Sequence, residues 1–356
     1  MSAATATPLL SVRDLQVHFP VGRGHWRAGA AVVRAVDGVS FDLERGRTLA
    51  IVGESGSGKT TTALSVMRLV EPTAGSIHFD GVDVTASRGA ALRALRRRFQ
   101  LIFQDPYSSL NPRQRAGEIV RAPLDLLKVG QPAGREARVA ELFAQVGLRP
   151  EQRQLFPHQF SGGQRQRLNI ARALASAPDL IVCDEPVSAL DIAIRAQILN
   201  LLRRIQREQG QSFLFISHDM AVVQHICDDI AVMYLGRIVE RAPRQAFFNR
   251  PLHPYSVALM SAVPTVHGGR ERARQRIRLA GDPPSPLQPP PGCGFAGRCP
   301  VAQARCHAEP PTLRETAAGH LVACHLVDVR EGVARPPLAP GAATPSTEPQ
   351  PQRSAA

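Results

Sequence analysis

The 356-residue sequence predicts an α/β fold with a parallel sheet, and three observations support this. Short, mostly apolar runs typical of buried strands occur at 48–52, 180–184, 212–216 and 230–234. Helical patterns separate the later runs, at 192–209 and 220–227. A glycine-rich loop joins the first run to another helical pattern, at 61–70. Strands that alternate with helices are typical of a parallel sheet covered by helices.

The glycine-rich loop matches the phosphate-binding pattern G-x-x-x-x-G-K-[ST] and has the strand-loop-helix context that this motif requires. Its glycines let backbone N–H groups point inward as an anion nest, and the helix adds the positive end of its dipole. Lys59 can reach the β- and γ-phosphates, and the hydroxyl of Thr60 can bind Mg²⁺. We therefore expect a P-loop NTPase fold whose nucleotide contacts are Gly53, Glu54, Ser55, Gly56, Ser57, Gly58, Lys59, Thr60 and Thr61.

Antiparallel strands are expected before and after this loop. Residues 9–19 alternate enough for an edge strand, and residues 32–43 suggest a further pair of strands. Residues 75–84 suggest a hairpin that turns at Asp80 and Gly81. Together these segments predict an N-terminal antiparallel β subdomain.

The remaining divisions follow from changes in pattern along the chain. Residues 88–175 are mostly helical in pattern, with Leu92, Leu95 and Phe99 spaced three and four apart, and we interpret them as an inserted helical subdomain. After Pro264 proline and glycine become frequent, and the run at 283–291 has the composition of a stiff linker. We expect a nucleotide-binding domain at 1–265, a small cysteine-containing extension at 266–328 and a disordered tail at 329–356.

The chain is basic, with a net charge of +13 and an isoelectric point near 10.7. Nucleic acid and anionic lipid headgroups are both physical explanations of such charge. Only 5% of residues are aromatic, and the arginines are scattered without aromatic residues between them. We therefore favour a solvated or membrane-proximal surface and expect no nucleic-acid partner. The sequence contains neither an apolar run of 18 residues nor a secretory signal, so a cytoplasmic location is expected.

Two further motifs suit chemistry on a nucleotide. The run at 180–184 ends in Asp184, which can help to hold Mg²⁺, and Glu185 can take a proton from the attacking water. Ser161-Gly162-Gly163-Gln164 opens an amphipathic helix and exposes backbone N–H groups as a second anion site.

The order of these motifs is similar to that of the ATP-binding subunit of an ABC transporter, over about residues 10–265. The residues that carry this resemblance are the phosphate loop, Gln104, Ser161-Gly162-Gly163-Gln164, Asp184-Glu185, Ser188-Ala189-Leu190-Asp191 and His218. One departure is Phe160, where the family most often has leucine. The resemblance implies an ATPase that uses ATP and Mg²⁺.

The same resemblance implies roles for individual residues. The family forms a head-to-tail dimer in which the segment 161–164 of one subunit closes on the γ-phosphate held by the other. Gln104 is implied to contact Mg²⁺ and the attacking water, His218 the γ-phosphate, and Asp191 to couple the two sites. An aromatic residue stacks on adenine in this family; Phe19 is the first candidate and Trp26 the second.

A finer resemblance, to the ATPases of oligopeptide and dipeptide importers, comes from residues 184–191, from Pro251-Leu-His-Pro-Tyr-Ser-Val-Ala-Leu-Met and from the cysteines of the extension. It implies a second ATPase subunit, forming a heterodimer, two membrane permeases and, indirectly, an extracytoplasmic solute-binding protein. The expected place is the cytoplasmic face of the inner membrane. The cargo could equally be nickel, glutathione or another small solute. The alternative is a soluble ABC ATPase acting on the ribosome or on DNA.

The six cysteines fall into two groups. Cys183 and Cys227 lie in a strand pattern and a helical pattern, and we expect both to be core thiols. Cys293, Cys299, Cys306 and Cys324 lie in a short segment that is too small to build its own core. Four thiolates could bind zinc, with His307 or His325 replacing one of them, or an iron–sulfur cluster; C-x2-C pairs that would favour zinc are absent, and the irregular spacing with Cys299-Pro300 suits a cluster at least as well. The resemblance to the peptide-importer ATPases implies a structural [4Fe–4S] cluster here, with Zn²⁺ as the alternative and free cysteines as the third outcome.

Overall fold

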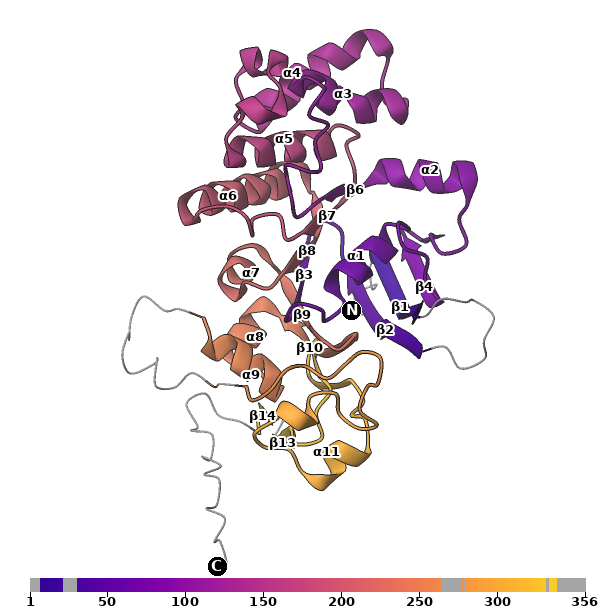
Figure 1. Ribbon diagram of the computed structural model, residues 1–356, viewed down its shortest axis with the longest axis vertical. Coiled ribbons are helices and arrows are strands. Elements are labelled where there is room, and N and C mark those ends of the chain that lie inside the picture. Colours follow the sequence, from indigo (N-terminus) through magenta and orange to yellow (C-terminus); the bar gives the residue numbers. More distant parts are fainter. Residues whose placement is uncertain (1–6, 22–30, 264–276, 278, 331–332, 338–356) are drawn as a thin grey trace, which may run out of the picture.

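A computed structural model describes residues 7–21, 31–263, 277, 279–330 and 333–337. Figure 1 shows the chain as three stacked regions: helices α3 to α6 above, a central sheet, and the C-terminal extension below. A second, smaller sheet lies beside the central one. None of the helices in these described ranges combines the length and the apolar character needed to cross a bilayer.

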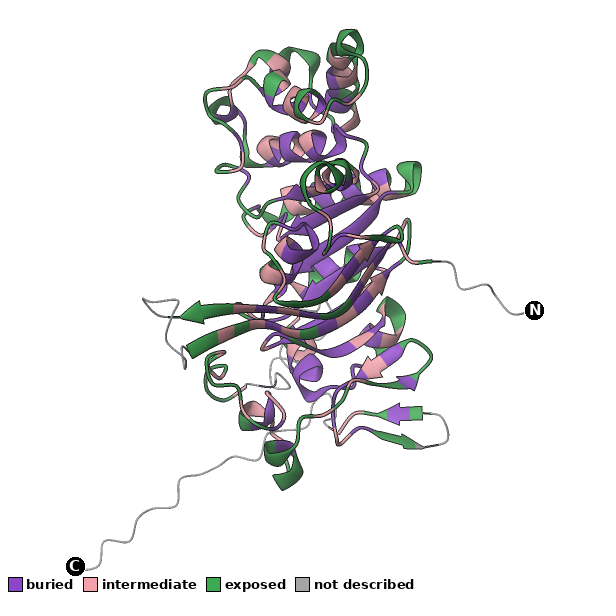
Figure 2. Ribbon diagram, turned by 90° about the vertical axis from the view of Figure 1, so that its right-hand side faces the viewer, coloured by how far each residue is buried: buried purple, intermediate pink, exposed green. Residues whose placement is uncertain are grey.

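The central sheet has eight strands in the order β11-β12-β10-β9-β3-β8-β7-β6. Its parallel strands are β6 (Phe99–Ile102), β7 (Leu180–Asp184), β8 (Ser212–Ser217), β3 (Thr48–Val52) and β9 (Asp229–Tyr234). β10 (Arg237–Pro243) runs antiparallel to β9. All residues of β3, β7 and β8 are buried, as the purple centre of Figure 2 shows. The predicted parallel sheet is confirmed.

Successive side chains of a strand point to opposite faces of the sheet. Because both faces are covered, each side chain packs into a core on its own side. Phe213 and Phe215 pack into the core shared with α5 (Gly162–Leu174) and α6 (Ile192–Gln209). Leu214 and Ile216 pack into the core shared with α1 (Lys59–Val66) and the smaller sheet. The other helices near the sheet are α7 (Met220–Ile226), α8 (Arg244–Asn249) and α9 (Pro254–Ser261). The continuous apolar runs in the sequence thus reflect burial on both sides.

The smaller sheet is antiparallel, with the order β2-β1-β4-β5. Its strands are β1 (Leu10–Val21), β2 (Ala31–Leu43), β4 (Ala74–Phe79) and β5 (Val82–Asp83). The predicted hairpin is confirmed, and its turn places Asp80 and Gly81 at φ of 51° and 79°. Two predictions are wrong. β1 is an inner strand between β2 and β4, and residues 31–43 form one long strand instead of a pair.

The helical region contains α2 (Gly89–Arg98), α3 (Ala116–Leu126), α4 (Arg135–Gln145) and α5, with short 3₁₀ turns at Pro132–Gly134, Pro150–Gln154 and Pro157–Gln159. The prediction that the helical pattern of 88–175 continues through Phe99 is wrong. Phe99 begins strand β6, which pairs with β7 at the edge of the central sheet. The chain therefore returns to the main sheet before it enters the helical layer.

The extension is attached to the central sheet through strand pairing. It contains the 3₁₀ turn η4 (Ala296–Arg298), α11 (Ala304–Ala308), β11 (Arg314–Ala317) and β12 (His320–Val322). β12 pairs with β10, and the buried carboxylate of Glu240 contacts Nε2 of His320 at 2.8 Å. The predicted disorder from 329 onward is wrong at its start, because β13 (Asp328–Arg330) pairs with β14 (Val333–Arg335).

Candidate functional site

The phosphate loop is shaped by glycines in conformations that other residues rarely adopt. Gly53, Gly56 and Gly58 have φ of 155°, 78° and 101°. A Cβ atom added to Gly58 would lie 2.2 Å from the carbonyl oxygen of Ala35 on β2. Gly58 is also the N-cap residue of α1, so the loop curls tightly between β3 and that helix. This curl forms the cradle of backbone N–H groups that the motif predicts.

Lys59 lies inside this loop with 5% of its surface exposed. Its Nζ donates to the carbonyl oxygens of Gly53 and Glu54, at 2.8 and 2.7 Å. Burial lowers the pKa of Lys59, and the nearby carboxylates of Glu185 and Asp184 oppose that effect. The structure thus brings the lysine next to both acidic residues of the second motif.

Oxygen atoms suited to Mg²⁺ meet at the carboxyl end of β7. The hydroxyl of Thr60 donates to Oδ1 of Asp184 at 3.0 Å. Burial raises the pKa of Asp184, while the hydrogen bond from Thr60 lowers it. A hydroxyl and a carboxylate are hard oxygen donors of the kind that Mg²⁺ prefers. These residues fit the predicted magnesium site.

Glu185, Gln104 and His218 form one hydrogen-bonded group. Nε2 of Gln104 donates to Oε2 of Glu185 at 3.0 Å, and Nδ1 of His218 lies 3.0 Å from Oε1 of Glu185. Glu185 has a φ of 46°, which is uncommon for a residue other than glycine. Its N–H is held by the carbonyl of Ile216, at 3.1 Å. The three residues predicted to act in catalysis are therefore brought together around one carboxylate.

The segment 161–164 lies apart from this group. Ser161 caps α5, and its hydroxyl accepts a hydrogen bond from the Gln164 N–H at 3.3 Å. Ser161 and Gly162 are exposed, whereas Gly163 packs so closely on Ile194 that a Cβ would lie 2.5 Å from its side chain. In the described ranges, no hydrogen bond joins this segment to the phosphate loop.

Asp191 caps helix α6. The aromatic residue that contacts adenine stays a prediction. The carboxylate of Asp191 accepts from the Ile194 N–H at 2.9 Å, at the start of α6. Phe19 lies on β1 opposite Val33, with 41% of its surface exposed. Trp26 lies outside the described residues.

The cysteines fall into the two expected groups. Cys183 and Cys227 are buried in the core, and burial raises the pKa of Cys227 to about 12. The remaining four line one small cavity without forming a disulfide: Cys293, Cys299, Cys306 and Cys324. Across the described residues, no three or more His, Cys, Asp or Glu side chains are grouped so that they could hold a metal ion. The predicted metal centre is therefore not supported by this geometry.

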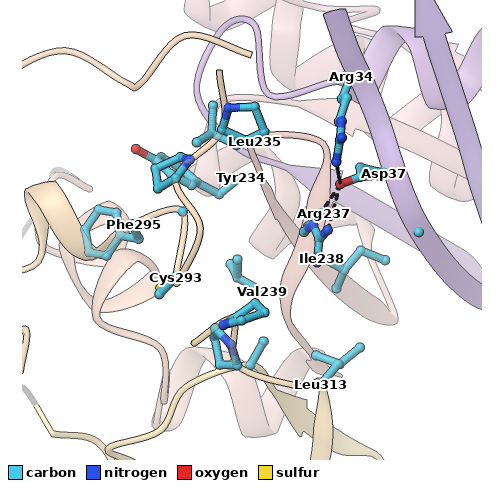
Figure 3. A pocket seen from close by; sticks show the side chains of 18 of the residues that line it. Arg34, Asp37, Tyr234, Leu235, Arg237, Ile238, Val239, Cys293, Phe295 and Leu313 are labelled. Atoms are coloured by element: carbon cyan, nitrogen blue, oxygen red, sulfur yellow. Dashed lines mark hydrogen bonds and ion pairs between the residues drawn. The ribbon is translucent and has the colours of Figure 1, made fainter. Parts of the chain in front are cut away.

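A large cavity in the described part of the chain is lined by no residue of the phosphate loop. It has a volume of about 830 Å³ and opens between β2, β10 and the proline-rich segment near 286–291. Figure 3 shows Arg34 and Arg237 converging on the Asp37 carboxylate at one side of it, and Tyr234 and Phe295 at the other. None of the predicted nucleotide contacts lines this cavity.

One contact to the phosphate loop has no counterpart in the sequence patterns. Arg298 of the extension donates to both carboxylate oxygens of Glu54, at 2.7 and 3.2 Å. The N–H of Glu54 donates to the hydroxyl of Tyr255 at 2.8 Å. No local signal could have revealed this, since Arg298 and Glu54 are 244 positions apart.

Two family models match the chain. The ABC transporter model matches residues 36–188, and the model of the oligopeptide/dipeptide transporter C-terminal region matches residues 239–306. The chain is 46% identical to the oligopeptide transport ATP-binding protein AppF of Bacillus subtilis, over 92% of this chain and 99% of AppF. It belongs to the ABC transporter ATP-binding proteins. It is also 46% identical to the dipeptide transport ATP-binding protein DppF of Escherichia coli, over 94% of this chain and 100% of DppF.

Solved structures agree with this ABC ATPase fold. The ATP-binding cassette MJ0796, solved as a dimer in a post-hydrolysis state with ADP and Pi, matches with a TM-score of 0.59 and 27% identity. That match covers 66% of this chain and 98% of MJ0796. CbiO1 of Clostridium perfringens matches with a TM-score of 0.59 and 26% identity, over 68% of this chain and 91% of CbiO1. As an ABC ATPase, the chain hydrolyses ATP.

Proposed function

We propose that this ABC ATPase energises the import of di- or oligopeptides, or of a related small solute, across a membrane. The support is the likeness to AppF and DppF over nearly the whole chain, including the C-terminal region that carries the oligopeptide/dipeptide transporter model. The single structural observation that carries the catalytic part is the hydrogen-bonded group formed by Glu185, Gln104 and His218 beside Lys59.

The site residues divide the work of hydrolysis. The loop at 53–60 and Thr61 bind the ATP phosphates, and the Lys59 ammonium neutralises charge on the β- and γ-phosphates. Thr60, Asp184 and Gln104 would hold Mg²⁺, which supplies charge neutralisation at the phosphates when bound. Phe19 supports the adenine ring.

Glu185 takes a proton from the attacking water while the water oxygen forms a bond to the γ-phosphorus. The bond from that phosphorus to the bridging oxygen breaks, and ADP leaves with the electron pair. Gln104 orients the water. His218 contacts the γ-phosphate and also holds the carboxylate of Glu185. Each residue thus acts on the same reacting group from a different side.

The complete site needs a second ATPase subunit. The exposed Ser161 and Gly162 can present backbone N–H groups to a γ-phosphate held by a partner, with Gly163 and Gln164 shaping the turn. Asp191 couples the two sites across that interface. We propose a heterodimer on the cytoplasmic face of the inner membrane, bound to two permeases that a solute-binding protein serves, without a nucleic-acid partner.

We further propose that Cys293, Cys299, Cys306 and Cys324 hold a structural [4Fe–4S] cluster. The support is that all four thiols line one cavity and that none is used in a disulfide. The alternative is a Zn²⁺ ion held by the same thiols. Iron and acid-labile sulfide in protein purified without oxygen would support the cluster; zinc alone, or no metal, would exclude it.

Reconstitution tests the import function. The chain is coexpressed with two permease subunits of its source organism, and ATP-dependent uptake of labelled di- and oligopeptides into vesicles is measured. Uptake that needs ATP supports the proposal. Purification with ribosomes or DNA instead of permeases would favour a soluble ABC ATPase of another pathway.

A further inference from the structure

The phosphate loop is clamped by a residue from outside the nucleotide-binding core. The two Nη atoms of Arg298 donate to the two carboxylate oxygens of Glu54, which makes the pair bidentate. Nη1 of Arg298 also donates to the hydroxyl of Tyr234 at 3.3 Å. The side chain of Arg298 is only 9% exposed and that of Glu54 is 30% exposed. A bidentate pair this shielded from water is an ordered contact, unlike a mobile surface ion pair.

Glu54 connects Arg298 to Lys59, because it forms hydrogen bonds with both residues. Its carbonyl oxygen accepts from Nζ of Lys59 at 2.7 Å, and its N–H donates to the hydroxyl of the buried Tyr255 at 2.8 Å. The carboxylate, the carbonyl and the N–H of one loop residue are thus each held by a different partner. A change at the Arg298 end therefore reaches the lysine through a single residue.

The ion pair between Arg298 and Glu54 also changes the charge that bound ATP meets in the phosphate loop. A carboxylate in a loop that binds polyphosphate repels the ligand, because the like charges interact at short range in a partly buried site. The Arg298 guanidinium offsets that negative charge at 2.7 Å. Removal of Arg298 would expose ATP to the uncompensated carboxylate of Glu54.

Arg298 is placed by the cysteine-containing part of the extension. It ends η4, where the Ala296 N–H donates to the carbonyl of Cys293 and the Cys299 N–H donates to the carbonyl of Ala296. Phe295 packs on Tyr234 and on Tyr255, with 5.4 Å between ring centres in both pairs. Figure 3 shows Tyr234 and Phe295 next to Cys293. The conformation of this short segment therefore determines where the guanidinium lies.

We propose that the C-terminal extension sets the ATP affinity of the phosphate loop through Arg298, a positioning residue that neutralises and orients Glu54. This rests on the proposed function in one respect, namely that the loop at 53–60 binds ATP. The extension is then a regulatory element of the ATPase, and the segment between Cys293 and Cys299 is its contact with the site.

A double-mutant cycle of Arg298 and Glu54 in the full-length chain tests this effect of Arg298 on ATP affinity. The dissociation constant of Mg-ATP is measured by calorimetry for the wild type, Arg298→Ala, Glu54→Gln and the double variant. Arg298→Ala should weaken binding about tenfold, because it leaves a carboxylate beside the phosphates. Glu54→Gln should bind Mg-ATP more tightly than the wild type, because the positive charge of Arg298 is then no longer offset by a carboxylate. The double variant should return to within about threefold of the wild type, because the carboxylate that Arg298 offsets is gone.

Matched controls separate this effect from a loss of folding. Arg305→Ala removes an exposed arginine of the same extension that pairs with Glu309, and it should leave ATP binding unchanged. Arg298→Lys keeps the positive charge but cannot form the bidentate pair with Glu54, and its affinity for ATP should fall between those of the wild type and Arg298→Ala. Thermal unfolding of each variant identifies those that lose the fold.

Two results would overturn the inference while leaving the proposed function intact. One is wild-type ATP affinity in Arg298→Ala. The other is a double variant as weak as Arg298→Ala, which would show that Arg298 acts on folding and not on the charge of Glu54. A wild-type chain that binds no ATP would instead overturn the proposed function, and this inference with it.

Discussion

Nδ1 of His218 lies 3.0 Å from Oε1 of Glu185, and this hydrogen bond joins the residues that follow two neighbouring parallel strands, β7 and β8. The strand pairing brings the two side chains to the same edge of the sheet. The second oxygen of Glu185 is held by Gln104. The carboxylate is therefore oriented from both sides, and each contact can be removed separately.

His218→Ala should lower kcat about 100-fold while the dissociation constant of ATP changes less than threefold, because the variant frees the carboxylate without touching the phosphate loop. Steady-state ATPase assays with a binding titration measure both. His225→Ala is a matched control, since this exposed histidine contacts Asn200 on the neighbouring helix. Equal losses of kcat in both variants would contradict the assigned role.

Lys59→Ala should nearly abolish ATP turnover and weaken ATP binding at least tenfold, because it removes the charge that faces the β- and γ-phosphates. It also removes the hydrogen bonds to Gly53 and Glu54, so the loop should become more mobile. Nucleotide titration and thermal unfolding report the two effects. Normal turnover by Lys59→Ala would show that this loop is not the catalytic site.

Gly58→Ala should weaken ATP binding at least tenfold and lower the free energy of unfolding by about 1–3 kcal/mol. The reason is the φ of 101° together with the 2.2 Å approach of the new Cβ to the carbonyl oxygen of Ala35. Gly130→Ala is the control, since this glycine has a φ of 63° but nothing near its Cβ site. Intact ATP binding by Gly58→Ala would contradict the described loop geometry.

His253 should make stability depend on pH. Burial lowers its pKa to about 4, whereas its ordinary value is 6.5. As the pH falls below 6.5, the unfolded chain binds this proton first, so the free energy of unfolding decreases down to about pH 4, by at most about 1.4 kcal/mol per pH unit. Above pH 6.5 the contribution is constant.

His253→Asn tests this dependence, because asparagine keeps an acceptor for the Tyr255 N–H at the start of α9 but does not titrate. Between pH 7 and pH 5 the wild type should lose more of its free energy of unfolding than the variant. Parallel pH curves for the two proteins would exclude this role for His253.

The parts of the fold that sequence reasoning predicted are those with a local signal. β3 and β7 are continuous apolar runs because the sheet is covered on both faces, and the phosphate loop follows directly from its motif. Phe99 was misassigned because Leu92, Leu95 and Phe99 continue a helical spacing up to the residue where the strand begins. Local periodicity cannot show that the pairing with β7 overrides it.

The residues of the site also differ in how far local sequence could predict them. Lys59, Thr60 and Asp184 could be assigned roles from their motifs, whereas the roles of Gln104 and His218 depended on a family resemblance. The contact of Arg298 with Glu54 was missed because the packing of the extension creates it across 244 positions. The β13–β14 pairing was missed because strands of three residues are too short to show an alternating pattern.

We assign Glu185 as the base that activates water for ATP hydrolysis. The most direct measurement is single-turnover hydrolysis of bound ATP by Glu185→Gln in the assembled transporter. The change keeps the size and the hydrogen bonds to Gln104 and His218 but removes the basic carboxylate. Glu185→Gln should bind ATP with wild-type affinity and hydrolyse it at least about 100-fold more slowly. Hydrolysis at the wild-type rate would contradict this assignment.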